Sequence, residues 1–196
     1  MERTGYRPFY ELSDPMIERM LSLFYHDRKR WAFTLQILFL TSRYEQILEA
    51  SRIERAVLDR SIFGDVIFAR MLAHYGDMGD HELEVYERLY SSLIRSVQPP
   101  LLMVYVRIST DLAVERIRRR GREYELVVER EYWERLNAEY EDYFRRYDLS
   151  PLLIINADDH EWVSEDGDGD LVVSKILDVL DRSRRGLLKA GTVIEI

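Results

Sequence analysis

The chain has 196 residues, 46% of them hydrophobic and 33% charged, so a single globular domain is the simplest expectation. It contains no cysteine, which excludes disulfides, thiolate nucleophiles and cysteine-ligated zinc. A net charge of −8 argues against nonspecific nucleic-acid binding, and no apolar run has the length of a membrane span or the form of a secretory signal. We therefore expect a cytoplasmic protein with neither nucleic-acid nor membrane partners.

Apolar residues in the N-terminal half recur either in short continuous runs, which predict strands, or at helical spacing, which predicts helices. In chain order these elements are a strand at 8–11, a helix from Asp14-Pro15, a helix at 31–49, a strand at 56–58, and helices at 62–75 and 81–97. Asp14 followed by Pro15 indicates a helix start, because Asp caps the first turn and Pro fits into it. The prolines at 99 and 100 end the last helix.

The C-terminal half continues the alternation. Its expected elements are a strand at 101–108, a helix from Ser109 or Thr110 to Arg120, a helix at 129–147, a strand at 151–156, an acidic glycine-rich loop at 165–170, a helix at 171–184 and a strand at 191–196. The alternation predicts an α/β fold, with a parallel sheet flanked by helices. We expect one domain over 1–196, with a possible strand in the tail 185–196. Ligands then bind at the carboxyl ends of the strands.

Polar residues follow three of the predicted strands. Glu11 follows the first strand, Asp59 and Arg60 follow the second, and Asn156 and Asp158 follow the one at 151–156. Because the carboxyl ends of parallel strands meet at one edge of a sheet, these side chains would converge in one crevice. A structural alternative is that Asp59 caps the next helix and Arg60 is a surface residue.

An arginine cluster follows the strand at 101–108. Arg116 and Arg120 share one face of the predicted helix, Gly121 ends it, and Arg122 extends the cluster into a loop. Clustered guanidinium groups fit a polyphosphate, which they bind through paired hydrogen bonds. The alternative is a solvated basic helix end that the helix dipole favours.

Two polar residues lie on the apolar face of the helix at 31–49. Gln36 and Arg43 are seven residues apart and therefore lie nearly on one face. A buried amide without a partner costs roughly 1–3 kcal/mol, so Gln36 requires either a protein partner or a ligand. An amide both donates and accepts, which suits the edge of a nucleobase.

Taken together, these residues resemble the deoxynucleoside kinase family, and most closely the bacterial deoxyadenosine and deoxyguanosine kinases. The order and spacing agree from about Pro8 to Asp158. The matching stretches are Pro8-Phe9-Tyr10-Glu11, Leu23-Phe24-Tyr25-His26-Asp27, Trp31-Ala32-Phe33-Thr34-Leu35-Gln36, Leu58-Asp59-Arg60-Ser61-Ile62-Phe63-Gly64-Asp65, Arg116 through Glu125, and Tyr140, Tyr143 and Phe144.

The resemblance implies roles for the residues around the sugar. Glu11 would be the general base that takes the proton of the nucleoside 5′-hydroxyl. Arg60 would lie beside that hydroxyl and steady the transferred phosphoryl group, with Asp59 counted among the substrate-binding residues. Tyr25 and Glu125 would hold the sugar 3′-hydroxyl.

Around the base and the phosphates, the resemblance implies a second set of roles. Gln36 would read the base, and Arg43 with Asp65 would form the polar pair that favours purine deoxynucleosides or deoxycytidine. The arginines that close over the ATP phosphates would be Arg116, Arg120 and Arg122. The resemblance also implies ATP and Mg²⁺ as cofactors and a homodimer, while no metal ligand is assigned within this chain.

The sequence departs from the family at its start. Members carry a first strand and a glycine-rich phosphate-binding loop ending in Gly-Lys-Ser/Thr about 30 residues before the base, whose amides, lysine and hydroxyl hold phosphates and magnesium. Here Glu11 comes ten residues after Met1, and the nine glycines include no such loop. Three explanations of the missing loop are ranked from most to least favoured. The first is that the sequence is N-terminally incomplete, the second is that another chain supplies the loop, and the third is that the chain is a natural protein without kinase activity that keeps the nucleoside pocket.

Two functional hypotheses follow. The first is an ATP-dependent deoxynucleoside kinase, whose 196-residue form is inactive or a fragment without its loop. The second is a non-catalytic nucleoside-binding or assembly protein with a kinase-like fold. A nucleoside monophosphate kinase is a weaker third, because it would not explain Glu11, Tyr25 and Gln36 in this order.

The C-terminal run resembles the missing first strand. Residues 192–196 could occupy the vacant central position of the sheet, but an edge strand or a frayed tail is at least as well supported.

Overall fold

The computed structural model describes residues 4–11, 14–159 and 169–196, and its contacts group the chain into two compact units. Unit 1 comprises Met1–Gln98 and Arg122–Val128, and unit 2 comprises Pro99–Gly121 and Glu129–Ile196. The single-domain organisation therefore stays a prediction. Across the described ranges, the helices all fall short of the length and apolar character that crossing a membrane requires. Most of the predicted acidic loop at 165–170 lies outside the described residues.

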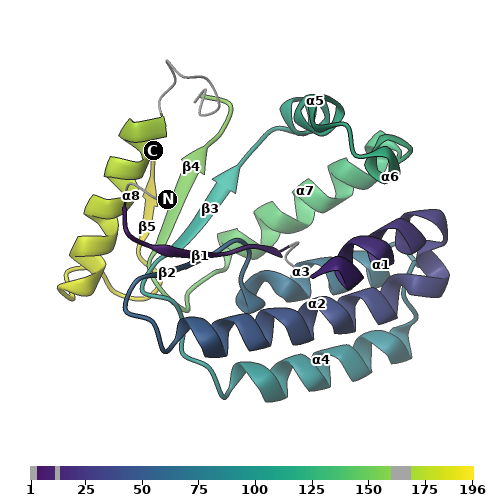
Figure 1. Ribbon diagram of the computed structural model, residues 1–196, viewed down its shortest axis with the longest axis horizontal. Helices are drawn as coiled ribbons and strands as arrows, with labels where there is room; N and C mark the ends of the chain where they lie inside the picture. Colours follow the sequence, from purple (N-terminus) through teal and green to yellow (C-terminus); the bar gives the residue numbers. More distant parts are fainter. Residues whose placement is uncertain (1–3, 12–13, 160–168) are drawn as a thin grey trace. The chain divides into compact units, whose positions relative to one another are not determined.

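Unit 1 is a helical layer with a small parallel sheet. Its elements are β1 (Arg7–Phe9), α1 (Pro15–His26), α2 (Arg28–Ala50), β2 (Ala56–Leu58), α3 (Ile62–His74), α4 (Asp80–Ile94) and α6 (Glu123–Leu126). β1 pairs in parallel with β2, with Phe9 opposite Leu58. α2 contacts both α3 and α4, and α2 lies beside α4 in Figure 1. The helices α1 to α3 bury their apolar faces, which include Phe24, Leu35 and Phe63.

Side-chain caps explain where the helices of unit 1 begin. Asp14 accepts from the Met16 amide, which confirms the predicted start at Asp14-Pro15. Ser61 caps α3 by accepting from the Phe63 amide at 3.3 Å. The alternative in which Asp59 caps this helix is therefore wrong. An uncapped first turn leaves amide groups unsatisfied, and Ser61 is two residues closer to the helix than Asp59.

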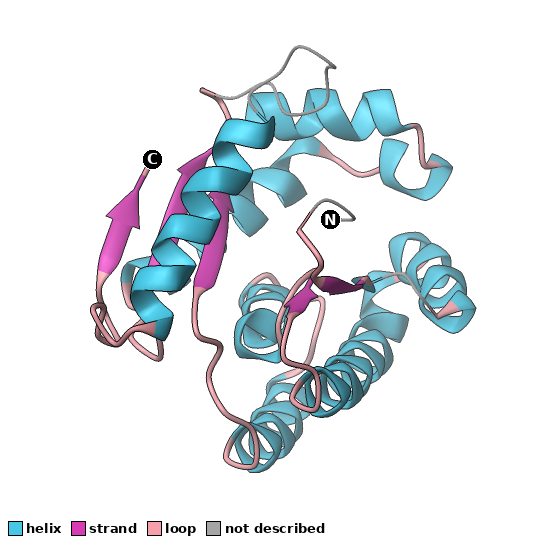
Figure 2. Cartoon of the chain, turned by 60° about the vertical axis from the view of Figure 1, so that its left-hand side comes forward, coloured by secondary structure: helices cyan, strands magenta, loops and turns pink. Residues whose placement is uncertain are grey.

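Unit 2 contains a three-stranded parallel sheet. Its elements are β3 (Met103–Arg107), α5 (Thr110–Arg120), α7 (Arg130–Arg145), β4 (Leu152–Asn156), α8 (Gly169–Arg184) and β5 (Val193–Glu195). The strand order is β3-β4-β5. α8 crosses one face of the sheet in Figure 2, where Val172 and Val179 pack with Leu153 and Ile155.

The predicted helix carrying the arginine cluster has the expected ends. Ser109 is the N-cap of α5 and accepts from the Leu112 amide at 3.3 Å. Gly121 ends the helix with φ 74°, a left-handed conformation that glycine adopts without steric cost. A carboxylate from the end of β4 also contacts this helix start, because Asp158 accepts from the Ser109 amide at 3.1 Å.

The C-terminal strand does not occupy a central position. β5 pairs with β4, with Leu152 opposite Val193, and lies at the edge of the β3-β4-β5 sheet on the side away from β3. The central placement is therefore wrong and the edge placement is confirmed. Arg107, on β3, forms an ion pair with Glu195 across β4, and this ion pair helps to hold β5 in place. Among the described residues the strands form two parallel sheets, whereas the sequence predicted one.

Candidate functional site

The carboxylate of Glu11 lies between two arginines of unit 1. Glu11 follows β1, and its Oε1 accepts from Nη2 of Arg43 on α2. Its Oε2 lies 3.0 Å from Nε of Arg60, which follows β2. The parallel pairing of β1 with β2 brings the two strand ends together, as the sequence predicted for a parallel sheet. Each oxygen of the carboxylate thus has a guanidinium partner, and its remaining lone pairs can accept further donors.

Arg43 connects Glu11 to a second carboxylate. Its Nη1 pairs with Oδ1 of Asp65 on α3, and its guanidinium lies 4.7 Å from the centroid of the Phe39 ring. Arg43 is 3% exposed and Asp65 1% exposed. Burial of two opposite charges together costs far less than burial of either alone, so each side chain depends on the other. The predicted Arg43–Asp65 pair is present in the structure.

A tyrosine completes this buried group. The hydroxyl of Tyr86, on α4, donates to Oδ2 of Asp65 at 2.5 Å. Burial raises the pKa of Tyr86, against an opposing effect of the positive charge of Arg43. The hydroxyl therefore stays protonated over the physiological range and remains a donor. Tyr86, Asp65, Arg43, Glu11 and Arg60 form one continuous polar chain from α4 to the strand ends.

Arg60 has an unusual backbone. Among the described residues other than glycine it alone has a positive φ, 69°. An L-residue in this conformation costs roughly 1–2 kcal/mol, and such strain occurs most often at functional sites. The guanidinium lies 4.9 Å from the centroid of the Phe68 ring, and its side chain is 38% exposed. The turn thus presents Arg60 to Glu11 from the β2–α3 connection.

Gln36 lies on α2 two turns before Arg43 and is only 2% exposed. Its Oε1 is buried and has no hydrogen-bond partner among the residues that the structure describes. An unsatisfied amide oxygen of this kind is costly, and native proteins seldom leave one without a partner or ligand. Gln36 does not join the Arg43–Asp65 pair by a hydrogen bond in this structure.

A second polar group of unit 1 joins α1 to α6. Tyr25 stacks on Tyr124 with ring centroids 5.9 Å apart. Burial is the largest cause that raises the pKa of Tyr25, and the nearby negative charge of Glu125 raises it further. Glu125 is buried and lies 3.4 Å from Arg122. The structure therefore brings Tyr25 and Glu125 together, as the resemblance implied.

The remaining predicted residues are distributed over both units. Asp59 is exposed, and its amide donates to the Phe9 carbonyl at 2.8 Å. Arg116 and Arg120 lie on α5 of unit 2, where Nη2 of Arg116 donates to the Ala157 carbonyl at 3.2 Å, while Arg122 belongs to unit 1. Within the described ranges, no three His, Cys, Asp or Glu side chains form a group that could hold a metal ion.

Sequence reasoning missed Tyr86 and Tyr124. Helical spacing predicted the helix that carries Tyr86, but nothing in the spacing links position 86 to Asp65, 21 residues earlier. Tyr124 lies in α6, a four-residue helix that was not predicted. A buried acid without a local partner is the signal that could have prompted a search for Tyr86, because such an acid requires donors.

Comparison with known proteins places these residues in a family. A sequence profile described as "Deoxynucleoside kinase" matches residues 1–181. A deoxyguanosine kinase of Lactobacillus acidophilus is 34% identical over 185 residues, covering 90% of this chain and 80% of the relative. A deoxyadenosine/deoxycytidine kinase of Bacillus subtilis is 31% identical over 192 residues, covering 94% of this chain and 86% of the relative.

Solved structures agree with the sequence matches. The deoxyadenosine kinase of M. mycoides with bound dATP superposes with a TM-score of 0.74 at 27% identity, covering 89% of this chain and 88% of that one. The same kinase with bound dCTP gives a TM-score of 0.73 at 26% identity, covering 90% and 88%. The α/β fold is thus shared with these kinase structures over most of the chain. The chain belongs to the deoxynucleoside kinase family.

Proposed function

We propose that this protein acts in the transfer of the γ-phosphoryl group of ATP to the 5′-hydroxyl of a deoxynucleoside, with purine deoxynucleosides or deoxycytidine favoured. The observation that carries the proposal is the placement of Glu11 between Arg43 and Arg60, with Asp65 paired to Arg43. A positioned carboxylate and adjacent guanidinium groups are what phosphoryl transfer requires, since catalysis there depends on positioning and charge stabilisation.

Glu11 is the proposed general base. Its carboxylate is held at both oxygens, which fixes its orientation and leaves lone pairs for the 5′-hydroxyl proton. Arg60 is the proposed stabiliser of charge on the transferred group, because its guanidinium contacts the base and is partly exposed. Tyr25 and Glu125 are proposed to hold the sugar 3′-hydroxyl, and Asp59 stays a proposed substrate contact.

The base would lie against Gln36 and Arg43. The buried Gln36 amide oxygen fits an amino group of adenine, cytosine or guanine, which is the kind of donor it lacks within the described chain. Arg43 supplies donors to acceptor atoms of the base. Thymidine presents a methyl group and no exocyclic amino group, so it should fit less well. The related kinase of M. mycoides, seen with dATP and with dCTP, supports this preference.

The phosphates of ATP are proposed to contact Arg116, Arg120 and Arg122. Guanidinium groups suit this anion, and the buried Nε of Arg116 has no hydrogen-bond partner within the described residues. Mg²⁺ would neutralise phosphate charge when bound with ATP. The 196 residues contain no Gly-Lys-Ser/Thr phosphate-binding loop, so we propose that the chain by itself has little kinase activity. We also propose that it forms a homodimer.

Binding calorimetry on the purified chain tests the nucleoside site directly. Deoxyadenosine, deoxyguanosine and deoxycytidine should bind, at least one of them more tightly than thymidine. Thymidine binding more tightly than every purine deoxynucleoside would contradict the proposed pocket. Kinase activity should be negligible for the chain alone and should appear when a phosphate-binding-loop segment is grafted before Met1. Robust activity of the chain alone would contradict the proposed need for that segment.

A further inference from the structure

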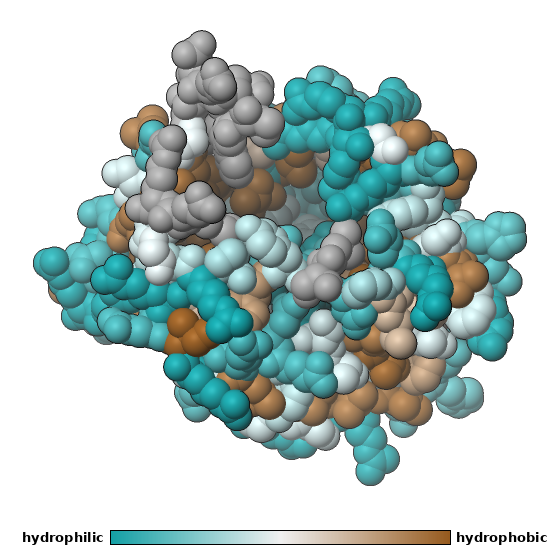
Figure 3. Space-filling view, viewed as in Figure 1, coloured by the Kyte–Doolittle hydropathy of each residue, from teal (hydrophilic) through white to brown (hydrophobic). Residues whose placement is uncertain are grey.

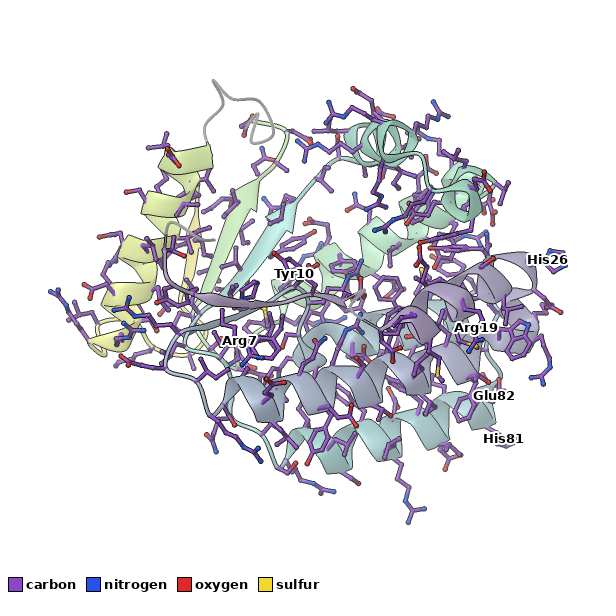
Figure 4. All side chains as sticks on the ribbon, viewed as in Figure 1. Arg7, Tyr10, Arg19, His26, His81 and Glu82 are labelled. Atoms are coloured by element: carbon purple, nitrogen blue, oxygen red, sulfur yellow. The ribbon has the colours of Figure 1, made fainter. Side chains whose placement is uncertain are left out.

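Tyr86 occupies an unusual position in unit 1. Within α4, every residue of which is described, Tyr86 is the only buried side chain, and it is 0% exposed. The start of α4 is fixed one turn earlier, where Glu82 accepts from the Gly79 amide at 2.9 Å (Figure 4 labels Glu82). A fully buried hydroxyl is costly unless it is hydrogen-bonded, so its partner explains why a tyrosine can stand here.

The partner of Tyr86 is the buried carboxylate of Asp65. The hydroxyl donates to Oδ2, while Oδ1 pairs with Nη1 of Arg43. With a hydrogen-bond donor on Oδ2 and an ion-pair partner on Oδ1, the carboxylate plane cannot rotate without losing one of the two contacts. The position of Oδ1 of Asp65 in turn restrains the guanidinium group of Arg43, because Nη1 of Arg43 pairs with that oxygen.

The orientation of Arg43 in turn affects Glu11 at the candidate site. Its Nη2 donates to Glu11, and the Phe39 ring lies against its guanidinium. A loss of the Tyr86 hydroxyl would leave Oδ2 of a buried carboxylate without its donor. The carboxylate would then rotate toward another donor, and Arg43 would follow it.

We propose that Tyr86 is a positioning residue that determines base specificity, because its hydroxyl fixes Asp65 and thereby aims Arg43 at the nucleobase. The proposal rests on the proposed function of the site that contains Arg43. Tyr86 itself does not touch the substrate. It prevents Asp65 from accepting directly from the base, so that recognition in this part of the pocket is made by the donors of Arg43.

Tyr90 provides a matched control. It lies one turn further along α4, its ring stacks on that of Tyr86 at 6.2 Å, and its hydroxyl donates to the Phe63 carbonyl at 3.1 Å. Tyr86→Phe and Tyr90→Phe therefore each remove one hydrogen-bonded tyrosine hydroxyl from the same helix. Tyr86→Phe should lower the melting temperature more than Tyr90→Phe, because its hydroxyl bonds a buried charged group, and only Tyr86→Phe disturbs Asp65.

The experiment measures dissociation constants of deoxyadenosine, deoxycytidine and thymidine for the full chain and both variants by calorimetry. Tyr86→Phe should weaken binding of the preferred deoxynucleoside about tenfold, as expected for loss of a hydrogen bond to a charged group, and should reduce its preference over thymidine. Tyr90→Phe should change the affinity for the preferred deoxynucleoside and the preference over thymidine by no more than about twofold. A residue that contributes only to the stability of the fold is expected to give this result.

A second comparison uses Asp65→Asn, which keeps the shape of the side chain and removes its charge. Because the proposed effect of Tyr86 passes through Asp65, Tyr86→Phe should weaken binding much less in the Asp65→Asn background. Equal effects in both backgrounds, or equal effects of Tyr86→Phe and Tyr90→Phe on binding, would overturn the inference alone. Absence of any deoxynucleoside binding by the unsubstituted chain would overturn the proposed function and the inference with it.

Discussion

At the scale of single residues, the site of unit 1 is a row of side chains with alternating charges, and their burial decreases from Asp65 to Arg60. Asp65 and Arg43 are almost completely buried, Glu11 is largely buried and Arg60 is more than one third exposed. Asp65, at the buried end, contacts Arg43 and Tyr86, whereas Arg60, at the other end, is partly exposed. Solvent access therefore increases from Asp65 to Arg60 along this polar group.

Glu11→Gln tests the general base. In a version of the protein with a phosphate-binding-loop segment grafted before Met1, we expect turnover to fall about 10²–10⁴-fold, because the amide keeps the shape but cannot take a proton. Deoxynucleoside affinity, measured by calorimetry, should stay nearly unchanged. Glu49→Gln is the control, since Glu49 also pairs with an arginine, Arg7, but at an exposed position. Normal turnover of the Glu11 variant would show that Glu11 is not the general base.

Arg43→Met tests the buried pair. Removing one partner leaves Asp65 as an uncompensated buried charge, so the free energy of unfolding should fall by about 3–5 kcal/mol. The matched control is Arg70→Met, because Arg70 pairs with Glu87 at 2.8 Å on the surface and should contribute less than about 1 kcal/mol. Denaturant titrations of the two variants give both values, and equal losses would show that the Arg43 pair is not the stabilising element.

At the scale of elements, the β2–α3 connection is the part of the fold that is most specialised for the site. It places the strained Arg60 directly before the Ser61 cap, so that a tight turn ends the strand, presents a guanidinium and starts a helix. The strain is offset by the ion pair to Glu11 and by the contact with the Phe68 ring.

Glycine and alanine substitutions measure this strain. Both Arg60→Gly and Arg60→Ala remove the guanidinium, but only alanine retains the cost of a left-handed backbone. Arg60→Gly should therefore be more stable than Arg60→Ala by about 1 kcal/mol. At Arg70, inside α3, the order should reverse, because glycine in a helix costs about 1 kcal/mol relative to alanine. Thermal unfolding of the four variants would refute the argument if the order were the same at both positions.

Most elements were predictable because their signals are local. The caps Asp14 and Ser109, the terminating Gly121 and the strand at 56–58 are encoded within a few neighbouring residues, and the structure has them where expected. The short helix α6 was missed because four residues carry no periodicity. The edge position of β5 was left open because strand order depends on contacts distant in sequence.

The site was only partly predictable for the same reason. The resemblance identified Arg43 and Asp65 as a pair, and their burial follows from their positions on α2 and α3. The contact of Arg43 with Glu11 and the donor Tyr86 could not be inferred, because each joins elements separated by 21 residues or more. The roles of the site residues in substrate binding and catalysis stay predictions.

At the scale of the whole molecule, the protein is acidic and its surface is mixed. The net charge is −8, and the face in Figure 3 shows hydrophilic residues interspersed with apolar ones. Val127, 75% exposed in unit 1, and Leu187, 67% exposed in unit 2, are among the most exposed apolar side chains. Such residues are common on protein surfaces and require no special explanation.

Ionic strength should affect ligands according to their charge. A deoxynucleoside is uncharged, so its affinity should change less than about twofold between roughly 0.05 M and 0.5 M salt. A deoxynucleoside 5′-monophosphate carries a phosphate, and its affinity should respond more strongly over the same range. Calorimetry at several salt concentrations separates the two. A steep salt dependence for the uncharged ligand would show that binding breaks surface ion pairs.

The polar chain from Asp65 to Arg60 also has a consequence for the kinetics of recognition. Its two carboxylates and two guanidinium groups have formal charges that sum to zero. The potential of such a balanced group decays faster with distance than that of a single charge, and a deoxynucleoside is uncharged, so the cluster does not steer a nucleoside from afar. Different deoxynucleosides should therefore arrive at similar rates, and selectivity should reside in their residence times, which depend on how well each base satisfies Gln36 and Arg43 once bound.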